Sequence, residues 1–154
     1  MTEFRKEQLC RTALLLGDSA MERLAHARVA VFGIGGVGGY VAEALARSGI
    51  GALDLIDGDT VSVSNLNRQI IALRSTVGRP KPEVMAERIR AIDPEIRVTL
   101  HTCFFTPEHA GEFDFTPSDY IADAIDMVTG KIQLAVPAQR DGAPLTGSRR
   151  HVTR

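Results

Sequence analysis

The stretch that most constrains the fold is a glycine cluster between an apolar run and a helical pattern. The apolar run covers residues 29–32, and five glycines follow it: Gly33, Gly35, Gly36, Gly38 and Gly39. Apolar and small residues then recur at helical spacing as far as Ser48. A strand, a tight turn and a helix are therefore predicted. Backbone N–H groups at such a turn can approach a phosphate closely, so this stretch is expected to hold a nucleotide.

An acid at the end of the next apolar run supports this interpretation. Residues 52–56 have the pattern of a second strand, and Asp57 follows them, twenty-four positions after the first glycine. A carboxylate at this place in a nucleotide-binding fold commonly accepts hydrogen bonds from ribose hydroxyls. The alternative to nucleotide binding is that the glycine turn serves only to pack the helix on the strand. Asp59 fits a turn as well as it fits a ligand contact.

Composition and charge exclude several classes. The 154 residues are 44% apolar and 24% charged with a formal net charge of -1, which gives no bulk electrostatic reason to bind nucleic acid or a membrane. Cys10 and Cys103 are far apart and lie in no metal-ligand motif, so neither a disulfide framework nor a zinc site is predicted. No apolar run has the length of a signal peptide or a membrane span, and a cytoplasmic location is expected.

The N-terminal segment is predicted to form two short helices. Apolar spacing over residues 5–26 is helical and is interrupted at Gly17, where Asp18 or Ser19 can cap the second helix. The expected division of the chain is N-terminal helices over 1–27, a nucleotide-binding domain over 28–146 and a basic tail over 147–154.

The remaining segments alternate between helix and strand. A helix is predicted from Pro82 to Asp93, with strands over residues 97–104 and 120–124. This alternation predicts an α/β fold: a Rossmann-like, doubly wound, mainly parallel sheet in the order 3-2-1-4, with helices on both faces, incomplete at its C-terminal side.

The last predicted helix contains a proline. Val128, Ile132 and Val136 have helical spacing, but Pro137 costs about 3 kcal/mol inside a helix unless the helix ends there. A fifth strand is expected to begin near Ala143.

Donors and acids suited to a triphosphate follow the second and fourth strands. Arg68 offers a planar fork for phosphate oxygens, and Lys81 offers a point charge. Asn65 and Gln69 lie in the same polar loop as Arg68. Asp126 follows the fourth strand, beside the glycine turn in the expected strand order, where a carboxylate can hold Mg²⁺ against phosphates. Singly, these residues can equally be solvated side chains or, for Asp126, a helix cap.

Four segments in this order resemble the adenylate-forming domain shared by ubiquitin-activating enzymes and the bacterial ThiF and MoeB proteins. They are GIGGVGGYVAEALARSGIGALDLIDGD, NLNRQ, VGRPKPEVMAERIRAIDP and DAID. Within this family the chain is most similar to the branch of the tRNA threonylcarbamoyladenosine dehydratases, in ARSGIGAL, NRQIIALRSTVG, EVMAERIRAIDPE and DAID. The resemblance implies carboxylate activation with ATP and Mg²⁺: attack on the α-phosphorus gives an acyl-adenylate and pyrophosphate, and a second nucleophile displaces AMP.

The resemblance also implies roles for residues at matching positions. Arg11 matches an arginine that reaches the ATP of a partner subunit, so a homodimer is implied, and Asp126 matches the metal ligand. The ending LTGSRRHVTR departs from the family pattern and is interpreted as a truncation or frameshift. The implied nucleotide contacts are Gly33, Gly35, Gly36 and Gly38 in the ATP loop, Asp57 at the ribose, and Asn65, Arg68 and Lys81 at the phosphates, with Asp59 as a further candidate contact.

Alternative functions stay open at this point. In the dehydratase branch the carboxylate belongs to a threonylcarbamoyl group on a tRNA adenosine, and Arg149, Arg150 and Arg154 can form a local basic patch for RNA. Related proteins instead adenylate the C-terminus of a ubiquitin-like sulfur-carrier protein. An NAD-binding oxidoreductase domain explains the glycines and Asp57 but gives no role to Arg68 or Lys81. An inactive nucleotide-binding fragment is the remaining alternative.

Overall fold

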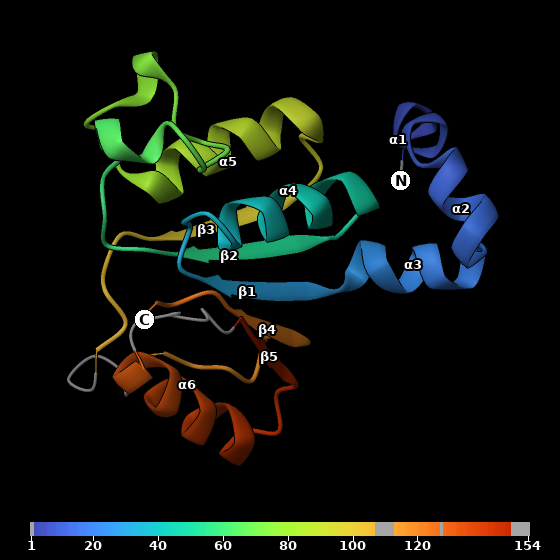
Figure 1. Ribbon diagram of the computed structural model, residues 1–154. Helices are drawn as coiled ribbons and strands as arrows, with labels where there is room; N and C mark the ends of the chain where they lie inside the picture. The colour runs from blue at the N-terminus through green and yellow to red at the C-terminus, as the bar shows by residue number, and fades with distance from the viewer. Residues whose placement is uncertain (1, 107–112, 127, 149–154) are drawn as a thin grey trace.

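A five-stranded sheet in the order β3-β2-β1-β4-β5 forms the centre of the computed structural model, which describes residues 2–106, 113–126 and 128–148 (Figure 1). All four strand pairings are parallel. The predicted α/β class and the order 3-2-1-4 are therefore confirmed. The strands are β1 (Arg28–Phe32), β2 (Ala52–Ile56), β3 (Arg97–His101), β4 (Tyr120–Asp123) and β5 (Leu145–Gly147).

Helices cover both faces of this sheet (Figure 1). α4 and α5 lie on one face, and α6 lies on the other. None of the described helices is long and apolar enough to cross a membrane. The helices are α1 (Glu3–Gln8), α2 (Cys10–Leu16), α3 (Asp18–His26), α4 (Gly38–Ser48), α5 (Lys81–Ile92) and α6 (Val128–Arg140), with short 3-10 turns at Val63–Asn65 and Arg74–Thr76.

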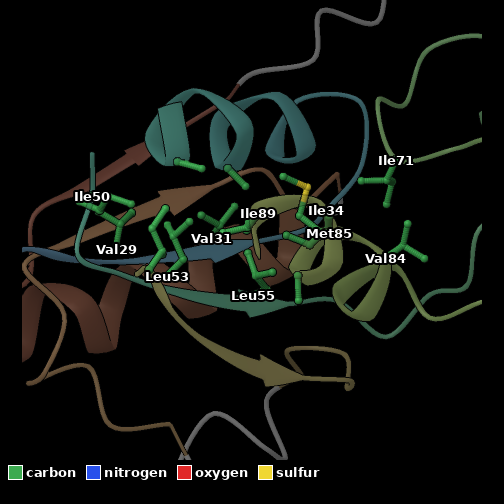
Figure 2. Packing of buried hydrophobic residues seen from close by; sticks show 14 of the residues in the cluster. Val29, Val31, Ile34, Ile50, Leu53, Leu55, Ile71, Val84, Met85 and Ile89 are labelled. Atoms are coloured by element: carbon green, nitrogen blue, oxygen red, sulfur yellow. The ribbon is translucent and has the colours of Figure 1, made fainter. Parts of the chain in front are cut away.

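The alternation of side chains along β1 divides the core into two layers. Val29 and Val31 pack with residues of β2, α4 and α5, and Figure 2 shows these side chains beside Leu53, beneath α4. The alternate residues of β1 pack on the other face with Phe115 and α6. Because β1 is buried on both faces, its carboxyl end is a rigid base for the glycine turn.

The N-terminal segment differs from its prediction. It forms three helices instead of two, and neither Asp18 nor Ser19 caps α3 in the described structure. The N-cap is Gly17, whose φ of +80° lets one residue both end α2 and begin α3, so no polar side chain stands at the cap position. Buried Arg5 attaches this segment to the core: it donates to the Ile50 carbonyl at 2.9 Å and lies 2.7 Å from Asp93.

The end of the third strand was predicted too far along the chain. β3 ends at His101, which pairs with Ile56, the last residue of β2. Beyond that pair β2 offers no further backbone to pair with. The chain therefore leaves the sheet, and Phe104, expected to lie in the strand, lies instead at the edge of a cavity.

α6 continues past Pro137 to Arg140. Leu134 and Ala138, one turn apart across the proline, are fully buried against the sheet, and this burial offsets the lost backbone hydrogen bond. Ile132 and Val136, whose spacing predicted the helix, lie on its exposed face. β5 follows α6 and pairs with β4, as expected from Ala143 onward.

Candidate nucleotide site

A cavity of about 600 Å³ opens where the carboxyl ends of β1, β2 and β4 meet. Its walls come from the glycine turn, the polar loop after β2, the start of α5 and the segments that follow β3 and β4. This is the switch point at which ligands bind in open α/β sheets. Nine residues singled out from the sequence line it: Gly33, Gly35, Gly36, Asp57, Asp59, Asn65, Arg68, Lys81 and Asp126.

The glycines of the turn serve two different purposes. A Cβ at Gly38 would lie 1.7 Å from the Gly33 carbonyl oxygen, and one at Gly33 would lie 2.7 Å from the Ala124 oxygen, so both positions need glycine for packing. At Gly35 and Gly36 the nearest atoms would be 3.7 Å away, on the side chains of Gln69 and Arg68. Gly35 and Gly36 therefore form the part of the turn whose backbone a ligand can approach.

Asp57 ties the glycine turn to the end of β2. Its Oδ2 accepts the Ile34 N–H at 2.6 Å, and its Oδ1 accepts the Asp59 N–H at 2.8 Å. The parallel register of β1 and β2 makes this possible, because the chain leaves both strands at the same edge. The carboxylate thus lines the cavity at a fixed position.

Lys81 places a buried ammonium at the wall of the cavity. Its Nζ lies 2.8 Å from Asp59 Oδ2 and 4.0 Å from Asp57 Oδ2, and only 7% of its side chain is exposed. A buried lysine needs such compensation because an unpaired ammonium is costly to remove from water. The cation also stands at the first residue of α5, whose N-terminus carries partial positive charge. This wall therefore favours an anionic ligand.

The polar loop contributes one rigid and two adaptable side chains. Asn65 is buried, and its Oδ1 accepts the Ser62 N–H at 3.0 Å, which shapes the loop. Arg68 is exposed and donates from Nη1 to the Ser64 carbonyl at 2.9 Å. Gln69 is buried in the cavity wall, and in the described structure its Oε1 has no hydrogen-bond partner. Sequence reasoning noted Gln69 in this loop but gave it no role.

Asp123, the last residue of β4, and Asp126, three residues further on, have different surroundings. Asp123 is buried, accepts the Ile125 N–H at 3.0 Å and pairs with Lys131 at 3.1 Å, so its contacts are structural. Asp126 is exposed and lines the cavity. Among the described residues no group of three or more His, Cys, Asp or Glu side chains could hold a metal. Asp126 alone fits Mg²⁺ only if phosphate and water oxygens complete the coordination.

The remaining predicted site residues do not line the described cavity, and their predicted roles stay predictions. Gly38 lies in α4 and is buried behind the turn instead of in the cavity wall. Arg11 lies in α2, at the amino ends of the strands and thus at the edge of the sheet opposite to the cavity (Figure 1). The expected basic patch of Arg149, Arg150 and Arg154 falls outside the described residues.

Apolar wall residues were missed from the sequence. Cys103, Phe104 and Phe105 line the cavity, and the Phe104 ring lies against Gly58, between Asp57 and Asp59. The strand predicted over residues 97–104 had assigned Cys103 and Phe104 to the sheet instead. The length of the second strand could have indicated the end of the third, because β3 can pair with β2 only over the residues that β2 has. A cavity lined by both apolar and cationic side chains suits a ligand with a flat base and a charged tail.

The fold is an α/β fold of Rossmann type, and its cavity, lined by glycines, carboxylates and cationic side chains, lies where this class of protein binds nucleotides. More particularly, the chain belongs to the ThiF family, whose model matches residues 9–149. The resemblance inferred from the four motifs is thereby confirmed.

Individual relatives narrow the comparison. The chain is 52% identical over 134 residues to the tRNA threonylcarbamoyladenosine dehydratase of Escherichia coli (strain K12), a match that covers 87% of this chain and 50% of that protein. It is 38% identical over 130 residues to a sulfur carrier protein adenylyltransferase of Thermus thermophilus, covering 84% of this chain and 48% of that one. The chain thus spans about half the length of these relatives.

A solved structure agrees with these sequence matches. The crystal structure of the E. coli tRNA N6-threonylcarbamoyladenosine dehydratase in complex with ATP superimposes with a TM-score of 0.90 at 48% identity. The match covers 94% of this chain and 59% of that one.

Proposed function

We propose that this chain binds ATP and activates a carboxylate as its adenylate, and that the carboxylate belongs to a threonylcarbamoyl group on a tRNA adenosine. The observation that carries the proposal is the meeting of nine predicted residues from five separate segments in one cavity. The dehydratase relative at 52% identity supports the choice of tRNA, and the similar crystal structure, a complex with ATP, supports the choice of nucleotide.

Each wall of the cavity has a role in this proposal. Asp57 accepts hydrogen bonds from the ribose hydroxyls, and the backbone at Gly35 and Gly36 approaches the phosphates. Arg68 and Lys81 neutralise the phosphate oxygens, with Asn65 beside them. Asp126 holds Mg²⁺, which when bound offsets charge on the phosphates.

The reaction proceeds in two displacements. A carboxylate oxygen of the substrate attacks the α-phosphorus, the bond from that phosphorus to the bridging oxygen breaks, and pyrophosphate leaves. A nucleophile within the same threonylcarbamoyl group then attacks the activated carbonyl, AMP leaves, and the ring closes with net loss of water. The protein contributes positioning and charge neutralisation, which are the main terms for such phosphorus chemistry.

Assembly and location complete the proposal. Arg11 lies on the opposite edge from its own cavity, so a contribution to a nucleotide requires a second copy, and we propose a homodimer in which α2 of one protomer approaches the cavity of its partner. A cytoplasmic location follows from the tRNA substrate.

Release of AMP from ATP tests this function. The purified chain is incubated with ATP, Mg²⁺ and either tRNA bearing threonylcarbamoyladenosine, the same tRNA without the modification, or a ubiquitin-like sulfur carrier. We expect AMP only with the modified tRNA, together with a ring-closed nucleoside found by mass spectrometry. If AMP release, or exchange of pyrophosphate into ATP, occurs only with the carrier, the second candidate function, adenylation of a sulfur-carrier protein, would be favoured. The sulfur carrier protein adenylyltransferase at 38% identity supports that candidate.

A further inference from the structure

We propose that Asp59 is a positioning residue, which holds the ammonium of Lys81 at the phosphate side of the cavity and does not itself contact the nucleotide. The inference rests on the proposed function, because it concerns the phosphate contact of Lys81. It separates the roles of two acids, Asp57 and Asp59, that the sequence grouped together.

Asp59 and Lys81 are joined twice. The Lys81 N–H donates to the Asp59 carbonyl at 3.0 Å, and Lys81 Nζ donates to Asp59 Oδ2 at 2.8 Å. Beside this pair, Thr60 and Pro80 form an isolated antiparallel bridge. The backbone of residues 59–60 is therefore fixed against the start of α5, and the carboxylate reaches the ammonium from a defined position.

Lys81 needs such a partner because its own backbone does not orient its side chain. Four rotatable bonds separate the ammonium from Cα, and fixing them has an entropic cost of up to about 2 kcal/mol. The helix N-terminus repels the cation, and burial removes most of its water. The carboxylate of Asp59 offsets these effects with the shortest ion pair that Lys81 makes among the described residues.

Asp57 cannot replace Asp59 as the partner of the Lys81 ammonium without losing its own backbone hydrogen bonds. Both of its oxygens accept backbone N–H groups, from Ile34 and from Asp59, and the nearer one is 4.0 Å from Lys81 Nζ. Asp59 differs, because 55% of its side chain is exposed and its Oδ2 points at the ammonium. An ammonium carries three donors, so one bond to Asp59 leaves Lys81 able to donate to phosphate oxygens.

A double-mutant cycle tests the assignment. ATP and AMP affinities are measured by calorimetry for the wild-type chain, Asp59→Asn, Lys81→Met and the double variant, each checked for folding by circular dichroism. We expect Asp59→Asn to weaken ATP binding about tenfold, the scale of one charge-assisted hydrogen bond. AMP, which lacks the β- and γ-phosphates, should lose less than about twofold, and in the Lys81→Met background Asp59→Asn should cause no further loss.

The control is Glu87→Gln. Glu87 lies in α5, like Lys81, but does not line the cavity, and the substitution removes a carboxylate from an ion pair with Arg79. It should leave both affinities unchanged. Equal weakening of ATP and AMP by Asp59→Asn, or a loss that persists without Lys81, would mean that Asp59 contacts the nucleotide and would overturn the assignment. Unchanged or tighter ATP binding would overturn it as well. A folded wild-type chain that binds no ATP would refute the proposed function first and this inference with it.

Discussion

At the scale of single residues, Gly38 and Gly36 differ sharply in their tolerance of a side chain. Gly38→Ala places a Cβ 1.7 Å from the Gly33 oxygen, so we expect the free energy of unfolding to fall by about 3 kcal/mol or more, measured by urea denaturation. Gly36→Ala meets nothing closer than 3.7 Å, and its unfolding free energy should change by less than about 1 kcal/mol. Similar losses in the two variants would contradict the distinction.

The different roles of Gly36 and Gly38 could not be predicted from the sequence. The motif predicted that all four glycines form the ATP loop, because letters alone do not separate a glycine that approaches a ligand from one that approaches its own backbone. The distinction depends on the distance between α4 and the carbonyl of Gly33, which is fixed only once the helix has packed on the sheet. The position of Asp57 was easier to predict from the sequence, because this residue directly follows a strand.

At the scale of elements, a charged cluster joins α4 to α5. Glu43 of α4 accepts hydrogen bonds from Arg47 at 2.8 Å and from Arg88 of α5. Burial by itself raises the pKa of Glu43, but the hydrogen bonds from Arg88 and Arg47 outweigh burial and hold the pKa below its ordinary value of 4.5. The cluster therefore fastens the helix that follows the glycine turn to the helix that begins with Lys81.

This pKa predicts how the cluster depends on pH. A carboxylate whose pKa is lower in the folded state stabilises the fold above its unfolded pKa and loses that contribution as the pH falls through the folded value. Relative to wild type, Glu43→Gln should therefore lower the unfolding free energy by about 1 to 2 kcal/mol at pH 7, and the gap should narrow as the pH falls below 4.5. Denaturation at several pH values measures this, with exposed Glu83→Gln as control. A gap that widens in acid would show that the sign is wrong.

Prediction of the elements succeeded where one local pattern determined the outcome. β1 and β2 are buried on both faces, so their apolar runs defined them almost to the residue. The end of β3 and the passage of α6 through Pro137 depend on partners distant in sequence, namely the length of β2 and the burial of Leu134 and Ala138. Rules that use only neighbouring residues in the sequence therefore could not predict these two features.

At the scale of the whole molecule, the position of the cavity follows from topology. Parallel strands in the order 3-2-1-4 bring the ends of β1, β2 and β4 together, and the site residues follow those ends or begin the helix that returns to the sheet. The sequence could therefore predict which residues meet. It could not predict that Lys81 and Asp59 pair, or that Phe104 and Cys103 line the cavity, because these depend on loop paths.

Calorimetric titration of the 154-residue chain with ATP, with and without Mg²⁺, is the decisive test of the proposed nucleotide site. We expect saturable binding at one site, weakened at least about tenfold by Asp57→Ala, the scale of one or two lost ribose hydrogen bonds. Asp126→Ala should weaken binding only when Mg²⁺ is present, and exposed Asp18→Ala, at the opposite edge of the sheet, should change nothing. A folded chain that binds no ATP, or binds NAD in preference to it, would show that the cavity is not an ATP site.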